Sequence, residues 1–85
     1  FNQAPIAILV NAELPEMNGY QFCSFCRKSS QLKDTPILLL GKRESLVEKI
    51  RSKLSGASGY LCEPFLPQEL LQSLNQLLPP KAIAS

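Results

Sequence analysis

Histidine and tryptophan are absent from this sequence of 85 residues, and Asp34 is its only aspartate. Without histidine, the chain has no imidazole for acid–base catalysis and lacks the commonest side-chain ligand of protein-bound metals. The longest uninterrupted apolar run, Ile6–Val10, is far shorter than the roughly 20 residues that a membrane-spanning helix needs. The three cysteines are an odd number, which indicates reduced thiols in a cytoplasmic protein rather than a disulfide framework.

The charge of the chain is small and locally uneven. Charged residues make up 19% of the sequence and the formal net charge is +2, which is too small to indicate a nucleic-acid or acidic lipid partner. Residues 42–53 nevertheless hold five lysines and arginines against two glutamates. Such a cluster can contact DNA phosphates, but it is more often the solvated face of a helix, and we adopt the second interpretation.

The length of the chain allows one small domain. With 45% hydrophobic residues, the 85 residues can bury one modest core and no more. The sequence opens on Phe1 rather than on methionine and shows no basic-then-apolar leader. We therefore expect a piece of a longer protein, without a secretory signal.

Secondary structure follows from the spacing of apolar residues. Three short apolar segments predict strands that are covered on both faces: Ile6–Val10, Ile37–Leu40 and Tyr60–Cys62. Segments with helical spacing alternate with them, over residues 19–30, 44–55 and 67–78. The second helix carries an apolar stripe formed by Leu46, Val47, Ile50 and Leu54. A strand followed by a helix, three times over, predicts an α/β fold with a parallel sheet.

Three blocks of sequence carry a resemblance to a known family. They are Leu-Pro-Glu-Met-Asn-Gly-Tyr (14–20), Thr-Pro-Ile-Leu-Leu-Leu (35–40) and Gly-Ala-Ser-Gly-Tyr-Leu-Cys-Glu-Pro-Phe (56–65). The blocks resemble, in that order, the loop after the third strand, the fourth strand, and the fifth strand with its following turn in response-regulator receiver domains of two-component phosphorelay signalling. The run from Arg51 to Leu61 is similar to cyanobacterial regulators in particular.

The resemblance implies a flavodoxin-like, doubly wound parallel sheet that is incomplete in this chain. Receivers have the strand order 2-1-3-4-5. Residues 1–80 correspond to the C-terminal two-thirds of the domain, with strands three to five and their helices, and residues 81–85 would be a tail or linker. The strand at Ile6–Val10 would then be an edge with one unpaired ladder. We therefore expect missing upstream residues, or a partner, to pair with it.

The resemblance also places three functional positions of receivers on residues that cannot perform their roles. The phosphoacceptor aspartate, four residues before the loop proline, corresponds to Asn11, whose amide has no anionic oxygen to attack phosphorus. The serine or threonine that binds the phosphoryl oxygens corresponds to Gly41. The lysine that neutralises the phosphoryl charge corresponds to Glu63, which would repel it. The resemblance thus implies a degenerate pseudo-receiver that carries out no phosphotransfer.

Tyr60 stands at the aromatic position that turns inward in receivers when the switch hydroxyl moves toward the phosphate. Because Gly41 has no hydroxyl, we expect any conformational change here to be independent of phosphate. Tyr60 itself is either part of a binding surface or a half-buried ring, and the sequence leaves both open. We expect a surface ion pair between Lys42 and Glu63. Because Glu63 precedes a proline, the sequence also permits a cis peptide bond between Glu63 and Pro64.

The segment Cys23-Ser-Phe-Cys26 has the spacing of a redox or zinc motif. On a helix, however, residues three apart share a face, and cysteine is among the most buried residue types. Zinc needs four ligands, and Cys62 is the only further cysteine. We therefore predict that both cysteines pack in the core and that no metal is bound. Phe25 faces differently and is a candidate exposed contact.

These features favour protein–protein interaction or scaffolding by a non-phosphorylatable module, without enzymatic activity. The expected surface is the one that receivers use for dimers and outputs, and the candidate residues are Lys49, Lys53, Tyr60, Gln72, Gln76 and Phe25. No cofactor, nucleic acid or membrane span is expected. Two alternatives stay open. One is the silent input domain of a longer transcriptional or signalling regulator, and the other is a fixed structural subunit of a large assembly, such as a photosynthetic one.

Overall fold

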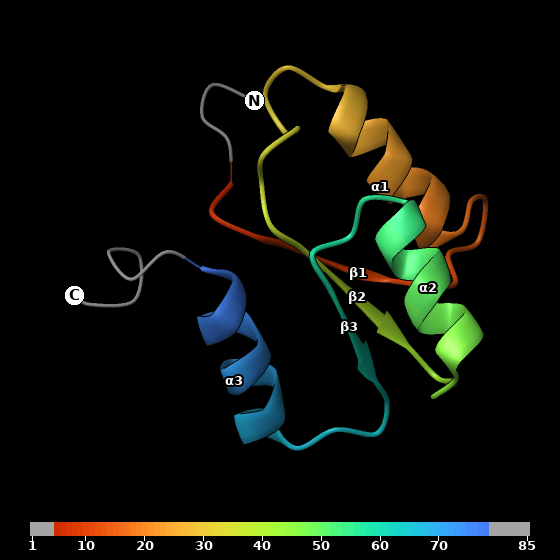
Figure 1. The fold of residues 1–85 in the computed structure, drawn as a ribbon, viewed down its shortest axis with the longest axis vertical. Coiled ribbons are helices and arrows are strands. Elements are labelled where there is room, and N and C mark those ends of the chain that lie inside the picture. The colour runs from red at the N-terminus through yellow and green to blue at the C-terminus, as the bar shows by residue number, and fades with distance from the viewer. Residues whose placement is uncertain (1–4, 79–85) are drawn as a thin grey trace.

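The computed structural model describes residues 5–78, in which strands and helices alternate along the chain (Figure 1). The elements are β1 (Ile8–Asn11), α1 (Gly19–Lys28), β2 (Ile37–Gly41), α2 (Leu46–Leu54), β3 (Gly59–Cys62) and α3 (Pro67–Leu77). This order confirms the predicted repeat of strand and helix. The predicted tail at residues 81–85 lies outside the described residues.

The three strands form one parallel sheet in the order β1-β2-β3. Over the described range, β1 has a neighbour on one side only, which confirms that it is an edge strand. It runs over Ile8–Asn11 rather than over the predicted Ile6–Val10. The ladder begins where Ile8 donates its N–H to the carbonyl of Pro36 and pairs with Ile37, the first residue of β2, so Ile6 has no residue of β2 beside it.

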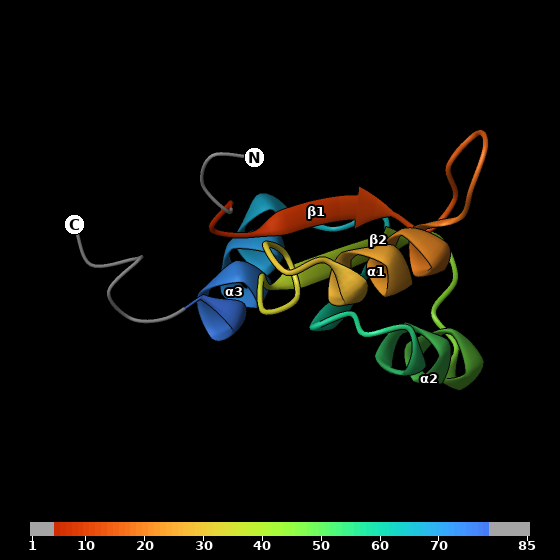
Figure 2. The same cartoon turned by 90° about the horizontal axis from the view of Figure 1, so that it is seen from above.

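Helices cover both faces of the sheet. Side chains alternate along a strand, and Leu39 of β2 lies against Gly19 at the start of α1. The neighbouring Leu38 faces the other side, where Leu77 of α3 also approaches Gly59. Figure 1 shows the strands nearly edge-on, with α1 and α2 on one side and α3 on the other, and Figure 2 shows α1 in front of the strands. The doubly wound arrangement is thereby confirmed.

The core lies between the sheet and α1. Ile37, Leu39, Cys23 and Cys26 have no exposed surface, and they belong to one apolar cluster. The prediction that both cysteines of the Cys-x-x-Cys segment pack in the core is therefore confirmed.

The opposite face of the sheet is covered less evenly. Beneath α3, Leu38 of β2 is buried, whereas Leu9 of β1 is 44% exposed. Leu71 of α3 is also exposed, although the sequence places it on the apolar side of its helix. The apolar surface beside the β1 edge is therefore open in the described part of the chain.

Local hydrogen bonds set where the helices begin. Asn18 caps α1 through its Oδ1, which accepts from the N–H of Gln21 at 2.8 Å, and the Gln21 side chain accepts in return from the N–H of Asn18. Ser45 caps α2 by accepting from the N–H of Glu48 at 3.2 Å, so this helix begins at Leu46 rather than at residue 44. Between residues 5 and 78, no helix is both long and apolar enough to cross a bilayer.

The predicted apolar stripe of α2 points away from the sheet. The four residues of this stripe, called the α2 stripe below, are between 49% and 84% exposed: Leu46, Val47, Ile50 and Leu54. On the side of the helix that faces the domain, Ser52 is buried and its hydroxyl donates to the carbonyl of Lys49. The α2 stripe therefore contributes nothing to the core.

Candidate functional site

A pocket of about 500 Å³ opens at the carboxyl ends of the three strands. Ligands of open α/β sheets usually bind at this end. Asn11 ends β1, Gly41 ends β2 and Glu63 directly follows β3, so the parallel sheet itself brings these three residues together. Tyr60 lines the same pocket. The four positions singled out in the sequence therefore converge on one site, and the Glu63–Pro64 peptide bond at its rim is cis.

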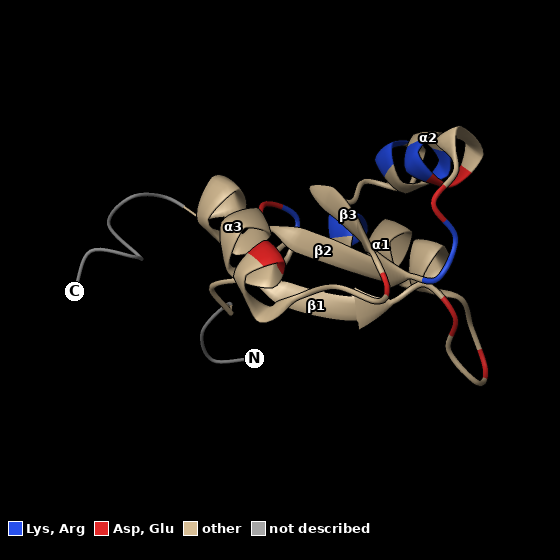
Figure 3. Ribbon diagram, turned by 90° about the horizontal axis from the view of Figure 1, so that it is seen from below, with Lys and Arg blue, Asp and Glu red and all other residues tan. Residues whose placement is uncertain are grey.

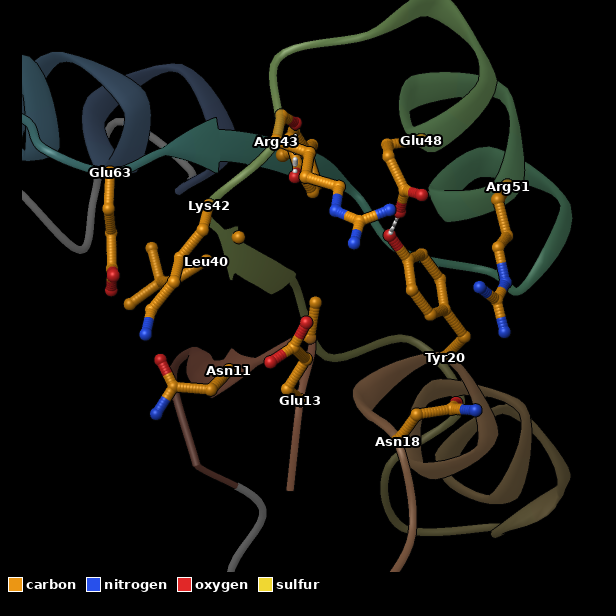
Figure 4. Close-up of a pocket in the computed structure, with 13 residues that line it drawn as sticks. Asn11, Glu13, Asn18, Tyr20, Leu40, Lys42, Arg43, Glu48, Arg51 and Glu63 are labelled. Atoms are coloured by element: carbon orange, nitrogen blue, oxygen red, sulfur yellow. Dashed lines mark hydrogen bonds between the residues drawn. The ribbon is translucent and has the colours of Figure 1, made fainter. Parts of the chain in front are cut away.

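Side chains of both charges line the pocket, as Figure 4 shows: Lys42, Arg43, Arg51, Glu13, Glu48 and Glu63. Equal numbers of cations and carboxylates leave no net charge to attract an anion. The predicted ion pair between Lys42 and Glu63 is not formed. In the range 5–78, the one ion pair joins the exposed side chains of Lys49 and Glu44 at 3.8 Å, a geometry worth about 0–1 kcal/mol in water.

Tyr60 occupies the space beside Gly41. A Cβ atom built on Gly41 would lie 2.6 Å from the Cζ atom of the Tyr60 ring and closer still to its hydroxyl oxygen. The hydroxyl donates to the carbonyl of Arg43 at 2.7 Å, and burial raises the pKa of Tyr60 above its ordinary value. The Tyr60 ring is partly buried and packs against the core cluster, and its part in a binding surface stays a prediction.

A second tyrosine, which the sequence did not single out, fastens α2 to α1. Tyr20 is a buried residue whose hydroxyl donates to the carboxylate of Glu48, and the Arg51 guanidinium lies 4.2 Å from the centre of the Tyr20 ring. Burial, followed by the contact with Glu48, raises the pKa of Tyr20 well above its usual range. Sequence spacing marks Tyr20 only as one more apolar residue of α1, so no local signal identifies its partners.

Comparison with known proteins identifies the fold family. No protein-family model matches the chain. Protein PilG of Pseudomonas aeruginosa is 32% identical over 75 residues, which cover 88% of this chain and 56% of PilG. Response regulator MprA of Mycobacterium sp. is 34% identical over 77 residues, 91% of this chain and 33% of MprA. The chemotaxis protein CheY4 of Vibrio cholerae superimposes with a TM-score of 0.80 at 38% identity, covering 86% of this chain and 61% of that one. The chain is a homologue of response-regulator receiver domains.

The described residues of this receiver homologue correspond to part of the family fold. Its three parallel strands and three helices match the flavodoxin-like receiver architecture, and a putative response regulator from Chloroflexus aurantiacus superimposes with a TM-score of 0.81 at 34% identity, covering 86% of this chain and 60% of that one. The chain spans about half the length of PilG and a third of MprA. The predicted resemblance to receiver domains and the predicted fold class are confirmed by these matches. The degenerate, cyanobacterial type of receiver stays a prediction.

The side chains that could serve metal binding or a redox reaction are the carboxylates and the thiols. Between residues 5 and 78, no group of three histidine, cysteine, aspartate or glutamate side chains could hold a metal ion. Cys23 and Cys26 are buried free thiols, and burial raises the pKa of both. A raised pKa keeps a thiol protonated, and the protonated form is a poor nucleophile and a poor metal ligand.

The candidate interface residues lie on different elements of the chain. Lys49 and Lys53 are exposed on α2, and Gln72 and Gln76 are exposed on α3. Figure 3 shows β3 between these two helices, with basic residues gathered on α2. The surface that the resemblance to receivers implies corresponds to α2, β3 and the polar side of α3. Phe25 is 65% exposed but belongs to α1, so it is not part of that surface.

Proposed function

We propose that this chain is a receiver that accepts no phosphoryl group and acts as a protein-binding module rather than as an enzyme. The observation that carries the proposal is Asn11 at the carboxyl end of β1, on the rim of the pocket. Its amide is neutral and cannot form the acyl phosphate that a carboxylate forms. A cytoplasmic location fits this proposal, and a cyanobacterial origin stays a prediction.

The rest of the pocket supports the same conclusion. Glu63 places a carboxylate at the site, and two like charges 4 Å apart repel by about 4 kcal/mol at an effective dielectric constant near 20. Gly41 offers no hydroxyl, and the Tyr60 ring fills the volume in which a side chain at this position would lie. A phosphoryl group would therefore meet neither a nucleophile at Asn11 nor a donor at Gly41.

Incubation with acetyl phosphate and Mg²⁺, followed by intact-mass measurement, tests the first half of the proposal. The expected result is no phosphoryl adduct, either on the natural chain or on the Glu13→Gln variant. The Asn11→Asp variant is the matched control, because it restores a carboxylate at the end of β1 and leaves the rest of the pocket unchanged. An adduct on the natural chain that hydroxylamine removes would contradict the proposal, and its loss in Glu13→Gln would name Glu13 as the acceptor.

The α2 stripe is the surface on which a partner would bind. Its four residues lie on one side of α2, each at least 49% exposed, and contiguous apolar surface on a soluble protein commonly marks an interaction site. The lysines beside the stripe, Lys49 and Lys53, are also exposed. In a dimer through this surface, the lysines of one copy's α2 would lie close to those of the other copy, and the like charges would repel. The complementary occupant is the acidic, amphipathic helix of another protein, since helices pack ridge into groove over the length that α2 offers.

Two synthetic helical peptides provide the probe for this surface. Both carry the same apolar stripe, flanked by glutamates in one and by lysines in the other, and fluorescence anisotropy measures their affinity. We expect the acidic peptide to bind at least about tenfold more tightly. The changes Leu54→Gln and Lys53→Glu should each weaken it, and Lys28→Glu on α1 should not. Equal binding of both peptides would contradict the assignment. Concentration-dependent dimerisation through the stripe would also contradict the assignment, as would binding to anionic vesicles in place of the acidic peptide.

The edge of β1 supports a second candidate, strand addition. Ile6 and Leu9 are 65% and 44% exposed beside this edge, and β1 is paired on one side only in the described range. An extended segment could pair there through its main chain.

The silent-input alternative also has one observation in its favour. The chain matches a third or less of several longer regulators, among them the DNA-binding transcriptional regulator RpaA of Synechocystis sp., 32% identical over 74 residues. The structural-subunit alternative stays a prediction.

A further inference from the structure

Gly41 and Tyr60 are neighbours on one face of the sheet. Tyr60 pairs with Leu39 across the β2–β3 ladder, and position 41 follows Leu39 by two residues, so side chains at 41 and 60 point to the same side. That side carries α1 and α2. The Tyr60 ring reaches diagonally across the end of β2 and covers Gly41.

The backbone does not require glycine at position 41. Among the described glycines, only Gly56 has a φ in the left-handed region, at 98°. Gly41 is an ordinary strand residue at the end of β2, and its conformation is open to any amino acid. What glycine provides here is room, because even a methyl group would collide with the ring of Tyr60.

The ring ties three segments together. Tyr60 belongs to β3, it covers the end of β2, and its hydroxyl donates to the carbonyl of Arg43 at 2.7 Å. Arg43 lies in the short connection before Ser45, the residue that caps α2. The hydrogen bond therefore joins β3 to the connection that leads into α2.

We propose that Gly41 and Tyr60 form a permanent latch, which holds the connection before α2 in one conformation without phosphate or any other ligand. This inference deepens the proposed function and rests on it in one respect: the latch keeps the α2 stripe presented to a partner at all times. A ligand can shift a protein between two states only by binding them unequally. Tyr60 already contacts this connection from the pocket, so no bound ligand is needed to hold it in place.

The test is a substitution that fills the space beside Gly41, which the Tyr60 ring now occupies. Gly41→Ala should expel the ring, and Gly59→Ala is the matched control, because the nearest atoms to a Cβ there would be side-chain methyl groups of Leu38 and Leu77, at 3.2 Å or more. Tyr20 and Tyr60 are the only two tyrosines, so NMR of the chain with ¹³C-labelled tyrosine resolves both rings. We expect the Tyr60 signals of Gly41→Ala to move to the positions and sharpness of a solvated ring. Those of Gly59→Ala should stay in place.

Tyr60→Phe separates the ring from its hydroxyl and avoids a steric clash. In this variant the ring stays in place, while amide exchange in the connection of residues 42–45 quickens by about fivefold, the factor that one lost neutral hydrogen bond corresponds to. The double variant Gly41→Ala with Tyr60→Ala should show the same amide exchange in residues 42–45 as Tyr60→Ala alone. Without the Tyr60 ring, the added methyl group at position 41 has nothing to collide with.

Two results would overturn the latch. One is a Tyr60 ring that keeps its natural signals in Gly41→Ala, and the other is an identical response in Gly59→Ala. Neither readout uses a binding partner or a phosphodonor. If the ring responds as expected but the acidic peptide does not bind the natural chain, the latch stands and the proposed binding surface fails. If the peptide binds and Gly41→Ala neither moves the ring nor weakens binding, the surface stands and the latch fails.

Discussion

The guanidinium group of Arg27 donates from its Nε to the carbonyl of Gly56 at 2.7 Å, joining the last turn of α1 to the turn that follows α2. The same guanidinium donates to three carbonyls of the connection before β2, those of Leu32, Lys33 and Thr35. Its second terminal nitrogen reaches the hydroxyl of Ser58. One side chain thus satisfies carbonyl groups from two connections that are distant in sequence.

Replacement of Arg27 by alanine should lower the free energy of unfolding by roughly 3 kcal/mol, because several carbonyls lose a charged donor at once. Arg27→Lys should recover less than half of this loss, since an ammonium group cannot imitate the planar fork of donors. Urea denaturation measures both. Lys28→Ala, next to it and exposed, is the control and should change the stability by at most about 0.5 kcal/mol. A similarly small effect at Arg27 would mean that these hydrogen bonds do not hold the connections.

The three thiols should react at very different rates. Cys23 and Cys26 are completely buried with a raised pKa, whereas Cys62 of β3 is half-buried. With Ellman's reagent near neutral pH, we expect one thiol per chain to react first and the other two at least about tenfold more slowly. Cys62→Ser should remove the fast phase, and urea should make all three equivalent. Fast reaction of Cys23 or Cys26 in the folded chain would reopen the redox interpretation of the Cys-x-x-Cys spacing.

Stability should fall in alkaline solution, in part through Tyr20. Burial and the contact with Glu48 raise the pKa of Tyr20 in the folded chain above the ordinary value of 10.0. The folded state therefore favours the protonated phenol, and its contribution to stability is complete below pH 10 and is lost as the pH rises above that value. Urea unfolding across this range should show a steeper loss for the natural chain than for Tyr20→Phe, which has no phenol to ionise. Parallel pH profiles would show that Tyr20 does not titrate differently in the folded and unfolded chains.

Much of the fold could be predicted because it depends on local patterns. The apolar runs at Ile37–Leu40 and Tyr60–Cys62 have no polar face to expose, so only a sheet covered on both sides accommodates them. The resemblance to receivers assigned Asn11, Gly41 and Glu63 to one site before any coordinates, and the structure places all three on one pocket. They lie together because the carboxyl ends of neighbouring parallel strands meet at one edge of the sheet.

The features that could not be predicted depend on contacts between distant residues. Helical spacing shows that α2 has an apolar side, but not which side faces the sheet. That choice depends on Tyr20, whose partner Glu48 lies 28 positions away, and on the Arg51 guanidinium above its ring. The carbonyl groups that accept hydrogen bonds from Arg27 belong to two connections that come together only when the chain folds. No sequence pattern shows that the Tyr60 ring occupies the room left by Gly41.

The outward direction of the α2 stripe can be tested by stability alone. Leu54 is 84% exposed and Val47 is 70% exposed, so Leu54→Gln and Val47→Gln should each change the free energy of unfolding by at most about 0.5 kcal/mol. Leu39 has no exposed surface, and Leu39→Ala should cost about 2–5 kcal/mol through lost burial and the cavity that remains. Urea denaturation of the three variants gives the comparison. A cost above about 1.5 kcal/mol at Leu54 would mean that α2 turns its stripe inward in solution, because solvent contact at that residue leaves no packing to lose.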